Sequence, residues 1–371
     1  MLKLALLTKK LPSSLFIINV TRLETDCRNV GAFSDIYIGE YKGQKVALKS
    51  MRMFQTMSDG ERARVLEKFH YESLIWRNLR HQHILQFYGI ADSLFTRSPC
   101  MVLPWMPFGH ITKALEDMRV SSAPREYIKK QLQTWAKIVS GLQYLHDEHV
   151  VHGDLRGPNI LIDNDLSVRL ADFGLAVFAA GASQNYASSR GGNVRWMAPE
   201  LILPEAFSLE SMRPTYASDV YSFGCVIVEL FSGKAPYPQF TRDPQVITHV
   251  TQGLHPSRPL PAQGIEIPDY LWKLATKCFS YRPSQRPTAR MLASMVQVPD
   301  AVSDRPTEPQ RGLCSLLAHL LFENSTEHGR IFRSKPACRT ETQETTGSQP
   351  GRKPCKGSRA SKLWIILFKW R

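Results

Sequence analysis

Three short motifs near the middle of the chain carry the residue types with the clearest chemical potential. Residues 152–159 read HGDLRGPN, residues 172–174 read DFG, and residues 198–200 read APE. Asp154 is a carboxylate that can accept the proton of a hydroxyl group, and Asn159 and Asp172 offer the oxygen ligands that Mg²⁺ prefers. A base beside a magnesium site is what phosphoryl transfer requires of a protein. The three motifs in this order therefore indicate that reaction.

The elements that hold these motifs can be predicted from the residues between them. Residues 159–162 and 168–171 are short apolar runs on either side of the sequence Asp163-Asn164-Asp165, as a β-hairpin requires. Such a hairpin places Asp154 and Asp172 beyond its opposite ends. We assign the two acids of the turn to local hydrogen bonding, which is common for aspartate in turns, and leave them out of the site.

A lysine and a glutamate upstream form a second group of candidates. Residues 46–49 are an apolar strand that ends in Lys49, and Glu72 lies in a segment predicted to be a helix. The apolar stripe of that helix, which we expect to lie against a sheet, consists of Tyr71, Leu74, Ile75 and Leu79.

With these motifs, residues from about 20 to 296 resemble a complete eukaryotic protein kinase domain. The sequences RWMAPE at 195–200 and DVYSFG at 219–224 are similar to the tyrosine-kinase-like group, and HGDL at 152–155 resembles fungal members of that group. The resemblance implies an α+β, two-lobed protein kinase fold, with a small, mainly β N-lobe that carries helix αC and a larger, mainly α C-lobe. We expect an N-lobe at about 20–103, a hinge at 104–109 and a C-lobe at 110–297.

Four residues take catalytic roles by this resemblance. Asp154 would be the base, Lys49 would pair with the α- and β-phosphates of ATP, and Glu72 would orient Lys49. Arg156 would contact the transferring phosphate with its planar fork. Asn159 and Asp172 would hold Mg²⁺. Glu61 and Glu67 compete for the role of Glu72, but only Glu72 stands at the family's distance from residues 79–85.

The resemblance also implies an ATP site between the lobes. Leu103 would be the gatekeeper, the carbonyl of Pro104 would face the adenine amino group, and the amide of Met106 would donate to the ring. The predicted nucleotide-binding residues are Gly31, Phe33, Ala47, Lys49, Leu103, Pro104, Met106, Leu161 and Asp172.

The loop at residues 29–34 departs from the family's G-x-G-x-x-G pattern, because only Gly31 remains. Glycine matters there since backbone amides must approach the phosphates without a Cβ in the way. Weaker nucleotide binding is expected.

Several further residues are expected to be structural. His152 is predicted to pack in a spine with Phe87, Trp76 and Phe173. Asp219 is predicted to start and cap an apolar helix at 220–231 while bonding the backbone near His152. Other structural expectations are a buried Glu200–Arg286 pair and a core stripe of Trp135, Ile138, Val139, Leu142 and Leu145.

Gly153 is a second departure from the family. Most regulated kinases have an arginine before the catalytic aspartate, where it binds a phosphate on the following activation segment. Glycine cannot do this, so constitutive activity or control outside the segment is favoured. The segment from 175 to 195 still offers hydroxyl groups at Ser183, Tyr186, Ser188 and Ser189.

Two alternatives remain beside an active protein kinase. Small-molecule phosphotransferases share the HGD and Asn159 pattern but lack the other motifs as a set, and a pseudokinase or scaffold would bind nucleotide or partners without significant catalysis. Specificity is open as well. RWM at 195–197 resembles Ser/Thr kinases, whereas Arg156 resembles some tyrosine kinases, and we favour Ser/Thr.

Whole-chain properties set wider bounds. The seven cysteines show neither metal-ligand nor disulfide spacing, which predicts a cytoplasmic or nuclear setting. No stretch approaches the ~20 apolar residues of a membrane span. Residues 1–19 are predicted to be an N-terminal extension and 298–371 a basic, disordered tail that contributes to the net charge of +14. We expect a monomer with protein substrates, no specific nucleic acid, and at most peripheral membrane contact through the tail.

Overall fold

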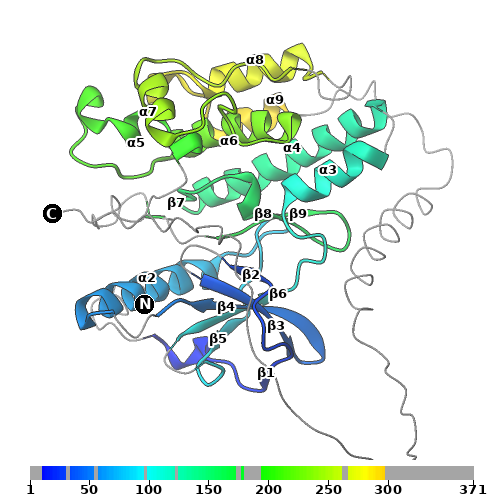
Figure 1. The fold of residues 1–371 in the computed structure, drawn as a ribbon, viewed down its shortest axis with the longest axis vertical. Helices are drawn as coiled ribbons and strands as arrows, with labels where there is room; N and C mark the ends of the chain where they lie inside the picture. The colour runs from blue at the N-terminus through cyan, green and yellow to red at the C-terminus, as the bar shows by residue number, and fades with distance from the viewer. Residues whose placement is uncertain are drawn as a thin grey trace, which may run out of the picture. The chain divides into compact units, whose positions relative to one another are not determined.

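A six-stranded antiparallel sheet begins the fold and a mainly helical region follows it (Figure 1). This arrangement confirms the predicted two-lobed α+β architecture. The computed structural model describes residues 11–30, 34–53, 57–95, 98–121, 124–172, 177–178, 194–260 and 266–296. These residues belong to one compact unit, and the second unit of the chain, residues 318–371, lies outside them.

The sheet has the strand order β1-β3-β4-β6-β5, with β2 paired to β3. Its strands are β1 (Val20–Arg22), β2 (Asn29–Val30), β3 (Ser34–Tyr41), β4 (Gln44–Met51), β5 (Gly89–Ala91) and β6 (Cys100–Pro104). Successive side chains of a strand alternate between faces, so Ala47 and Lys49 of β4 point to one face while Val46 and Leu48 point to the other. Val46 and Leu48 belong to a small core of their own on that other face.

The sheet face that carries Lys49 is covered by helix α2 (Asp59–Asn78), which runs alongside the strands in Figure 1. Ser58 caps this helix and exchanges hydrogen bonds with Glu61, which explains why Glu61 is not the partner of Lys49. Leu74 and Ile75 of the predicted stripe are buried. Burial of this stripe fixes which side of α2 faces β4.

Residues 11–18, predicted to lie in an extension, pack against the N-lobe. Leu15 is only 2% exposed, and the amide of Ile17 donates to the carbonyl of Ile90 at 2.9 Å. A Cβ built at Gly89 would lie 2.7 Å from the carbonyl oxygen of Leu15, so this approach needs glycine there. These contacts place residues 11–18 alongside β5, at the edge of the sheet.

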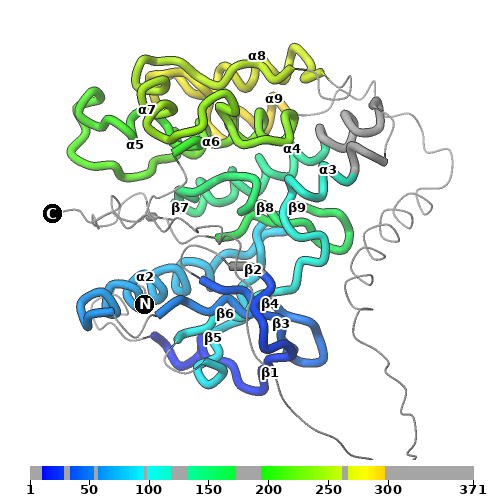
Figure 2. Tube along the Cα trace, viewed as in Figure 1, coloured from blue at the N-terminus to red at the C-terminus, as the bar shows by residue number. Residues whose placement is uncertain are grey.

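Residues 105–110 connect β6 to the helical lobe, as the colours of Figure 2 follow from β6 into α3 (Ile111–Ser121). The amide of Ile162 donates to the carbonyl of Gly109 at 2.9 Å, and His110 forms an isolated bridge with Leu161. The connection is therefore fixed to the strand that contains Leu161.

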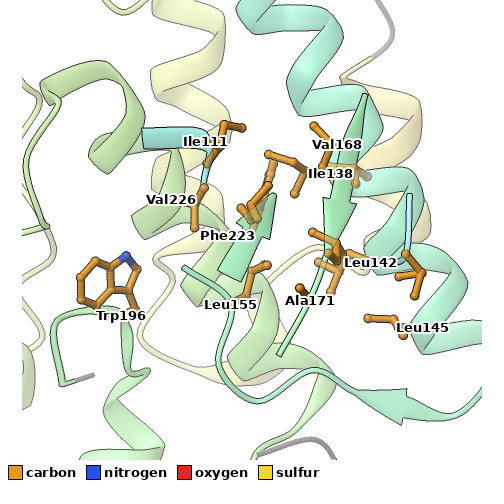
Figure 3. Close-up of a cluster of buried hydrophobic side chains, with 14 of the residues drawn as sticks. Ile111, Ile138, Leu142, Leu145, Leu155, Val168, Ala171, Trp196, Phe223 and Val226 are labelled. Carbon is orange, nitrogen blue, oxygen red and sulfur yellow. The ribbon is translucent and has the colours of Figure 1, made fainter. Parts of the chain in front are cut away.

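The C-lobe is built around two long helices, α4 (Pro124–Asp147) and α6 (Tyr216–Ser232). The predicted stripe of α4 is confirmed, because each of its five side chains is fully buried, and Figure 3 shows Ile138, Leu142 and Leu145 in the same cluster as Phe223 and Val226 of α6. The helices of this lobe are α3 (Ile111–Ser121), α4 (Pro124–Asp147), α5 (Pro199–Ile202), α6 (Tyr216–Ser232), α7 (Asp243–Thr251), α8 (Asp269–Cys278) and α9 (Ala289–Met295).

Helix α6 begins earlier than the sequence predicted. Its cap is Thr215, whose hydroxyl accepts from the amide of Ser218, and the hydroxyl of Ser218 donates to the carbonyl of Thr215. The prediction that Asp219 caps the helix is therefore wrong, since Thr215 already fills that position. Asp219 lies inside the first turn, where its carboxylate is available for other partners.

The predicted hairpin is confirmed. Strand β8 (Ile160–Ile162) pairs antiparallel with β9 (Val168–Leu170). In the turn, Asp163 accepts from the amide of Asn164 at 2.7 Å and Asp165 accepts from that of Ser167 at 2.9 Å. Both acids therefore make the predicted turn contacts. Strands β7 (Val150–Val151) and β10 (Val177–Phe178) form a second short pair.

Candidate active site

Asp154 lies in the loop between β7 and β8 and makes close contacts with the two polar residues that follow it. The side-chain amide of Asn159 donates to both the carbonyl and the carboxylate of Asp154 at 2.8 Å, and Nε of Arg156 lies 3.3 Å from the same carboxylate. Burial, together with the negative charge of Asp172, raises the pKa of Asp154 to about 6, although Arg156 and Asn159 oppose the shift. The carboxyl group can therefore change its charge close to neutral pH.

The backbone just before Asp154 is held by Asp219, which is 1% exposed. Its two oxygens accept from the amides of His152 and Gly153 at 2.8 and 2.9 Å, as predicted, and Nε2 of His146 lies 2.9 Å away. Carboxylate bonds to backbone amides are strong because the acceptor is charged. Asp219 therefore fixes the start of the loop to α6.

Asp172 follows β9, and because Ile160 pairs with Leu170, it lies at the same open end of the hairpin as the loop of Asp154. The predicted placement of the two acids at opposite ends is therefore wrong. Its φ of 63° is a left-handed conformation that is uncommon for a residue with a side chain. Oδ1 of Asp172 accepts from the ammonium group of Lys49 at 3.0 Å. Burial opposes the charge, but Lys49 outweighs it and keeps the pKa of Asp172 below its usual value.

Lys49 and Glu72 form the predicted pair. Nζ of Lys49 donates to Oε1 of Glu72 at 2.8 Å, and the side chains are 8% and 3% exposed. Burial lowers the pKa of Lys49, but the charges of Asp172 and Glu72 outweigh it, so the net shift is upward and the ammonium stays charged. Burial raises the pKa of Glu72. The three groups join β4, α2 and the end of β9.

Asn159 and Asp172 provide the chemistry of a magnesium site. The amide nitrogen of Asn159 is used by Asp154, so its oxygen is the atom left to bind a cation, and the second oxygen of Asp172 is likewise the one not bonded to Lys49. Within the described ranges, no group of three or more His, Cys, Asp or Glu could hold a metal ion. Mg²⁺ suits this donor set, because it is usually held by one or two carboxylates with substrate phosphates and water.

The predicted adenine-binding residues flank the connection between the lobes. Leu103 is buried in β6 opposite Ala47 of β4, and Leu161 approaches the connection through its bridge to His110. Pro104 ends β6, and Met106 is 8% exposed. Ala47 of the N-lobe pairs with Leu103 and Leu161 of the C-lobe pairs with His110, so the two side chains flank the opposite ends of residues 103–110.

Some predicted residues lie outside the described residues. They are Gly31 and Phe33 of the phosphate loop, Phe173 of the spine, the four hydroxyl residues between 175 and 195, and the basic tail. Of the predicted spine, Trp76 and Phe87 stack with ring centroids 6.1 Å apart, and His152 is fully buried.

The buried pair expected in the C-lobe is also present. Arg286 donates to the two carboxylate oxygens of Glu200 at 2.6 and 2.7 Å, and both side chains are almost completely buried. This pair fixes residues 198–200 to the last part of the lobe.

Sequence reasoning missed two charged residues. Lys68 lies one helical turn before Glu72, and burial lowers the pKa of Lys68 although the charges of Glu72 and Asp172 oppose the shift. The four-residue spacing on one helix was the available signal. Glu229, which lies in the apolar second half of α6, is 5% exposed. An acid among apolar residues signals a buried group that needs partners.

None of the helices in the described part of the chain is both long enough and apolar enough to cross a membrane. The four cysteines described, Cys27, Cys100, Cys225 and Cys278, are free thiols.

The family model described as "Protein tyrosine and serine/threonine kinase" matches residues 28–296. Among curated proteins, the chain is similar to "Mitogen-activated protein kinase kinase kinase 2" of Arabidopsis thaliana, with 30% identity over 268 residues, which is 71% of this chain and 38% of the relative.

It is also similar to "Serine/threonine-protein kinase STY46" of the same plant, with 28% identity over 80% of this chain and 48% of the relative. "Probable serine/threonine-protein kinase drkA" of Dictyostelium discoideum is 31% identical over 70% of this chain and 36% of the relative. The chain spans less than half the length of these curated relatives.

Proposed function

This chain belongs to the protein tyrosine and serine/threonine kinase family, and on that premise we propose that it transfers the γ-phosphoryl group of ATP to hydroxyl groups of proteins. The observation that carries the proposal is the arrangement of Lys49, Glu72 and Asp172. A buried ammonium bonded to two carboxylates, one of them part of the predicted magnesium site, supplies positive charge where phosphates would bind.

Asp154 is the proposed base. Its carboxylate accepts the proton of the substrate hydroxyl as the oxygen attacks the γ-phosphorus. The bond from Asn159 fixes the direction of the carboxylate, and Arg156 places a positive charge beside it. A pKa of about 6 leaves most of the base ionised at neutral pH while keeping it able to take a proton.

Lys49 binds the α- and β-phosphates, and Glu72 holds its ammonium in place. Asn159 and Asp172 hold Mg²⁺, which when bound neutralises the phosphate charge and orients the γ-phosphoryl group. By resemblance to the family, Ala47, Leu103 and Leu161 would contact the adenine ring, and the carbonyl of Pro104 and the amide of Met106 would bond its edge. Gly31 and Phe33, which lie outside the described residues, would cover the phosphates.

We further propose Ser/Thr specificity and membership of the tyrosine-kinase-like group. The relatives named as serine/threonine kinases support the specificity, and the RWMAPE and DVYSFG sequences support the group. HGDL at 152–155 suggests a fungal-type member. Arg156, where most Ser/Thr kinases have lysine, would serve the same contact with the transferring phosphate.

Phosphotransfer by the purified protein on generic protein substrates tests the proposal. Incubation with ATP and Mg²⁺, followed by mass spectrometry of the modified residues, should find phosphoserine and phosphothreonine. Phosphotyrosine alone would overturn the specificity. If the protein shows neither magnesium-dependent thermal stabilisation by ATP nor phosphotransfer, it is instead a pseudokinase or scaffold, as the reduced phosphate loop would allow.

A further inference from the structure

Residues 11–18, here called the strap, cross the edge of the N-lobe sheet before the first strand begins. The amide of Ile17 donates to the carbonyl of Ile90 at 2.9 Å, and Phe16 forms an isolated parallel bridge with the same residue of β5. Leu15 belongs to the core on the α2 side of the sheet, whereas Ile17 packs against the core on the other side. The strap therefore closes the edge of the layer between the sheet and α2.

The strap also contacts the last turn of α2. Nη2 of Arg77 donates to the hydroxyl oxygen of Ser14 at 2.8 Å. The next residue, Leu15, is only 2% exposed, and its carbonyl oxygen would lie 2.7 Å from a Cβ built at Gly89. The strap is thus fixed at three points, which are the end of α2, the core beneath that helix and the backbone of β5.

The position of α2 depends on the half of the helix that the strap contacts. The buried residues of α2, which the structure describes in full, are Phe69 and residues 72–76. Residues 59–68, the first half of the helix, are exposed or half-buried. Since a helix is held in place mainly by the packing of its buried face, contacts around the second half decide where α2 lies against the sheet.

The same half of α2 carries the contacts with Lys49. Glu72 and Trp76 are four residues apart and therefore share one face of the helix. Nζ of Lys49 lies 2.8 Å from Oε1 of Glu72 and 5.8 Å from the centroid of the Trp76 ring. Trp76 precedes Arg77, the residue that bonds the strap. A displacement of this end of α2 would therefore move Glu72 relative to Lys49.

We propose that Ser14 and Leu15 are positioning residues, through which the strap holds the end of α2 where Glu72 meets Lys49. The family model begins to match at residue 28, so the strap lies outside the matched region. The consequence for catalysis rests on the proposed kinase function, because Lys49 is the proposed phosphate-binding group. Displacement of about 1 Å at such a group can slow a reaction about a hundredfold.

The first test removes the buried anchor in the full chain and measures hydrogen–deuterium exchange by mass spectrometry. Leu15→Ala should speed exchange of the amides of residues 69–78 about tenfold, because the end of α2 loses packing. Leu15→Met, which keeps the volume, should restore slow exchange. Leu292→Ala is the matched control, since Leu292 of α9 is also fully buried. It should lower the melting temperature without changing exchange in α2.

The second test changes the contact between Ser14 and Arg77. Ser14→Asp gives the arginine a charged partner and should slow exchange at residues 69–78 about two- to threefold. In an Arg77→Gln background the same change at Ser14 should have no effect, because the cation that it would pair with is gone. Arg64→Gln is the control background. Arg64 is an exposed arginine in the first half of α2, so Ser14→Asp should keep its effect there.

Kinetics on the same samples connect the strap to the site. Leu15→Ala should lower kcat/KM for ATP about tenfold, while Leu15→Met and Leu292→Ala should change it less than threefold. Exchange in α2 that stays at the wild-type rate in Leu15→Ala, or wild-type kinetics of that variant, would overturn the inference.

Two further outcomes are distinguishable from these. If Leu15→Ala does not fold, the comparison of Ser14→Asp in the Arg77→Gln and Arg64→Gln backgrounds decides, since these side chains are on the surface. Equal effects in both backgrounds would then reject the strap. A wild-type protein without phosphotransfer would overturn the proposed function, and exchange in α2 would still report whether the strap holds the helix.

Discussion

Among the residues that the structure describes, each lobe has a buried ion pair of a lysine or arginine with a glutamate, and the two pairs differ in how the donors of the basic group are used. In the N-lobe, Lys49 and Glu72 are 2.8 Å apart with side chains 8% and 3% exposed. In the C-lobe, Arg286 and Glu200 are 2.6 Å apart with side chains 0% and 1% exposed. The two pairs are thus nearly alike in the burial of their side chains and in the distance between their charged atoms.

The guanidinium of Arg286 has all five N–H donors occupied by the protein. Two go to Glu200, and the others go to the carbonyls of Ser280, Ala217 and Tyr281. A group with no donor left cannot bind a ligand without losing an existing bond. This pair can only hold the fold together.

The ammonium of Lys49 is different. Among the described residues, Glu72 and Asp172 occupy two of its three donors, and the side chain of Asp172 is 45% exposed. A third donor and a partly exposed carboxylate give this charge access to a ligand. The Lys49–Glu72 pair therefore differs from the Arg286–Glu200 pair in two ways that favour ligand binding: its cation keeps a third N–H donor, and its further partner Asp172 is partly exposed.

The largest expected effect is on turnover, from changes at the ligand-facing acids. Asp154→Asn and Asp172→Ala should each lower phosphotransfer about a thousandfold or more, because one would remove the proposed base and the other a proposed magnesium ligand. The fold should survive, since Lys49 keeps Glu72 as a partner. Assays with labelled ATP, together with thermal unfolding, measure both effects.

Glu200→Ala is the contrasting variant for this prediction. It should unfold the protein or lower its melting temperature strongly, because the charge of Arg286 would be left buried without its carboxylate. A stable Glu200→Ala protein, or an Asp172→Ala protein that does not fold, would erase the distinction between the two pairs.

Matched substitutions of the two cations should separate stability from activity. Arg286→Met should lower the free energy of unfolding by about 3 to 5 kcal/mol, because the carboxylate of Glu200 is left buried and unpaired. Lys49→Met should lower it by less than half as much, since burial already raises the pKa of Glu72 and lets it take up a proton. Urea unfolding at constant m-value measures both.

Lys49→Met should in turn lower turnover about a hundredfold or more, because the proposed donor to the phosphates is lost. Equal losses of stability in the two variants, or normal turnover in Lys49→Met, would contradict the comparison. Lys45→Met, an exposed lysine of the same strand, is the control and should change neither quantity.

The pH dependence of kcat/KM should report the ionisation of Asp154, the proposed base. With its pKa raised to about 6 by burial, Asp154 is protonated at lower pH, so kcat/KM should fall about tenfold per pH unit below 6. Arg156→Gln removes a charge that lowers this pKa, so the acid limb should move to higher pH. A limb that stays in place in Arg156→Gln would show that another group is the base.

The ionisation of Asp154 should also make the free energy of unfolding depend on pH, in a direction that can be predicted. The folded protein keeps Asp154 protonated up to about pH 6, whereas the unfolded chain loses that proton near pH 4. Between these values the folded state binds more protons, so Asp154 alone makes the free energy of unfolding fall as pH rises. Asp154→Asn should remove this contribution.

The smallest expected effect concerns phosphorylation of the segment from 175 to 195. Gly153 gives the loop no arginine to bind a phosphate, and Arg195 already bonds three backbone carbonyls. Phosphatase treatment, or Ser188→Ala combined with Ser189→Ala, should therefore change turnover less than tenfold, which is about 1.4 kcal/mol of barrier. A hundredfold loss that rephosphorylation restores would identify another basic receptor, and Lys68 would be the first to test.

The sequence by itself determined the local elements and the order of the motifs. The apolar run before Lys49 predicted the strand that carries this lysine, although β4 continues to Met51. The apolar stripe of α2 predicted which side of that helix is buried, and the Asx turn between residues 162 and 168 specified the hairpin. These features depend on neighbours a few residues apart, so residue type and spacing are sufficient to predict them.

Only the tertiary structure decided which distant groups satisfy one another. Asp219 was expected to cap its helix, but Thr215 does so, and Asp219 bonds the loop before Asp154 instead. No sequence pattern indicated that Glu229 accepts hydrogen bonds from both Gly157 and Trp196, or that Leu15 packs beside Gly89. Buried charges and amides must find partners, but the chain's path through space, rather than local spacing, determines which partners lie within 3 Å.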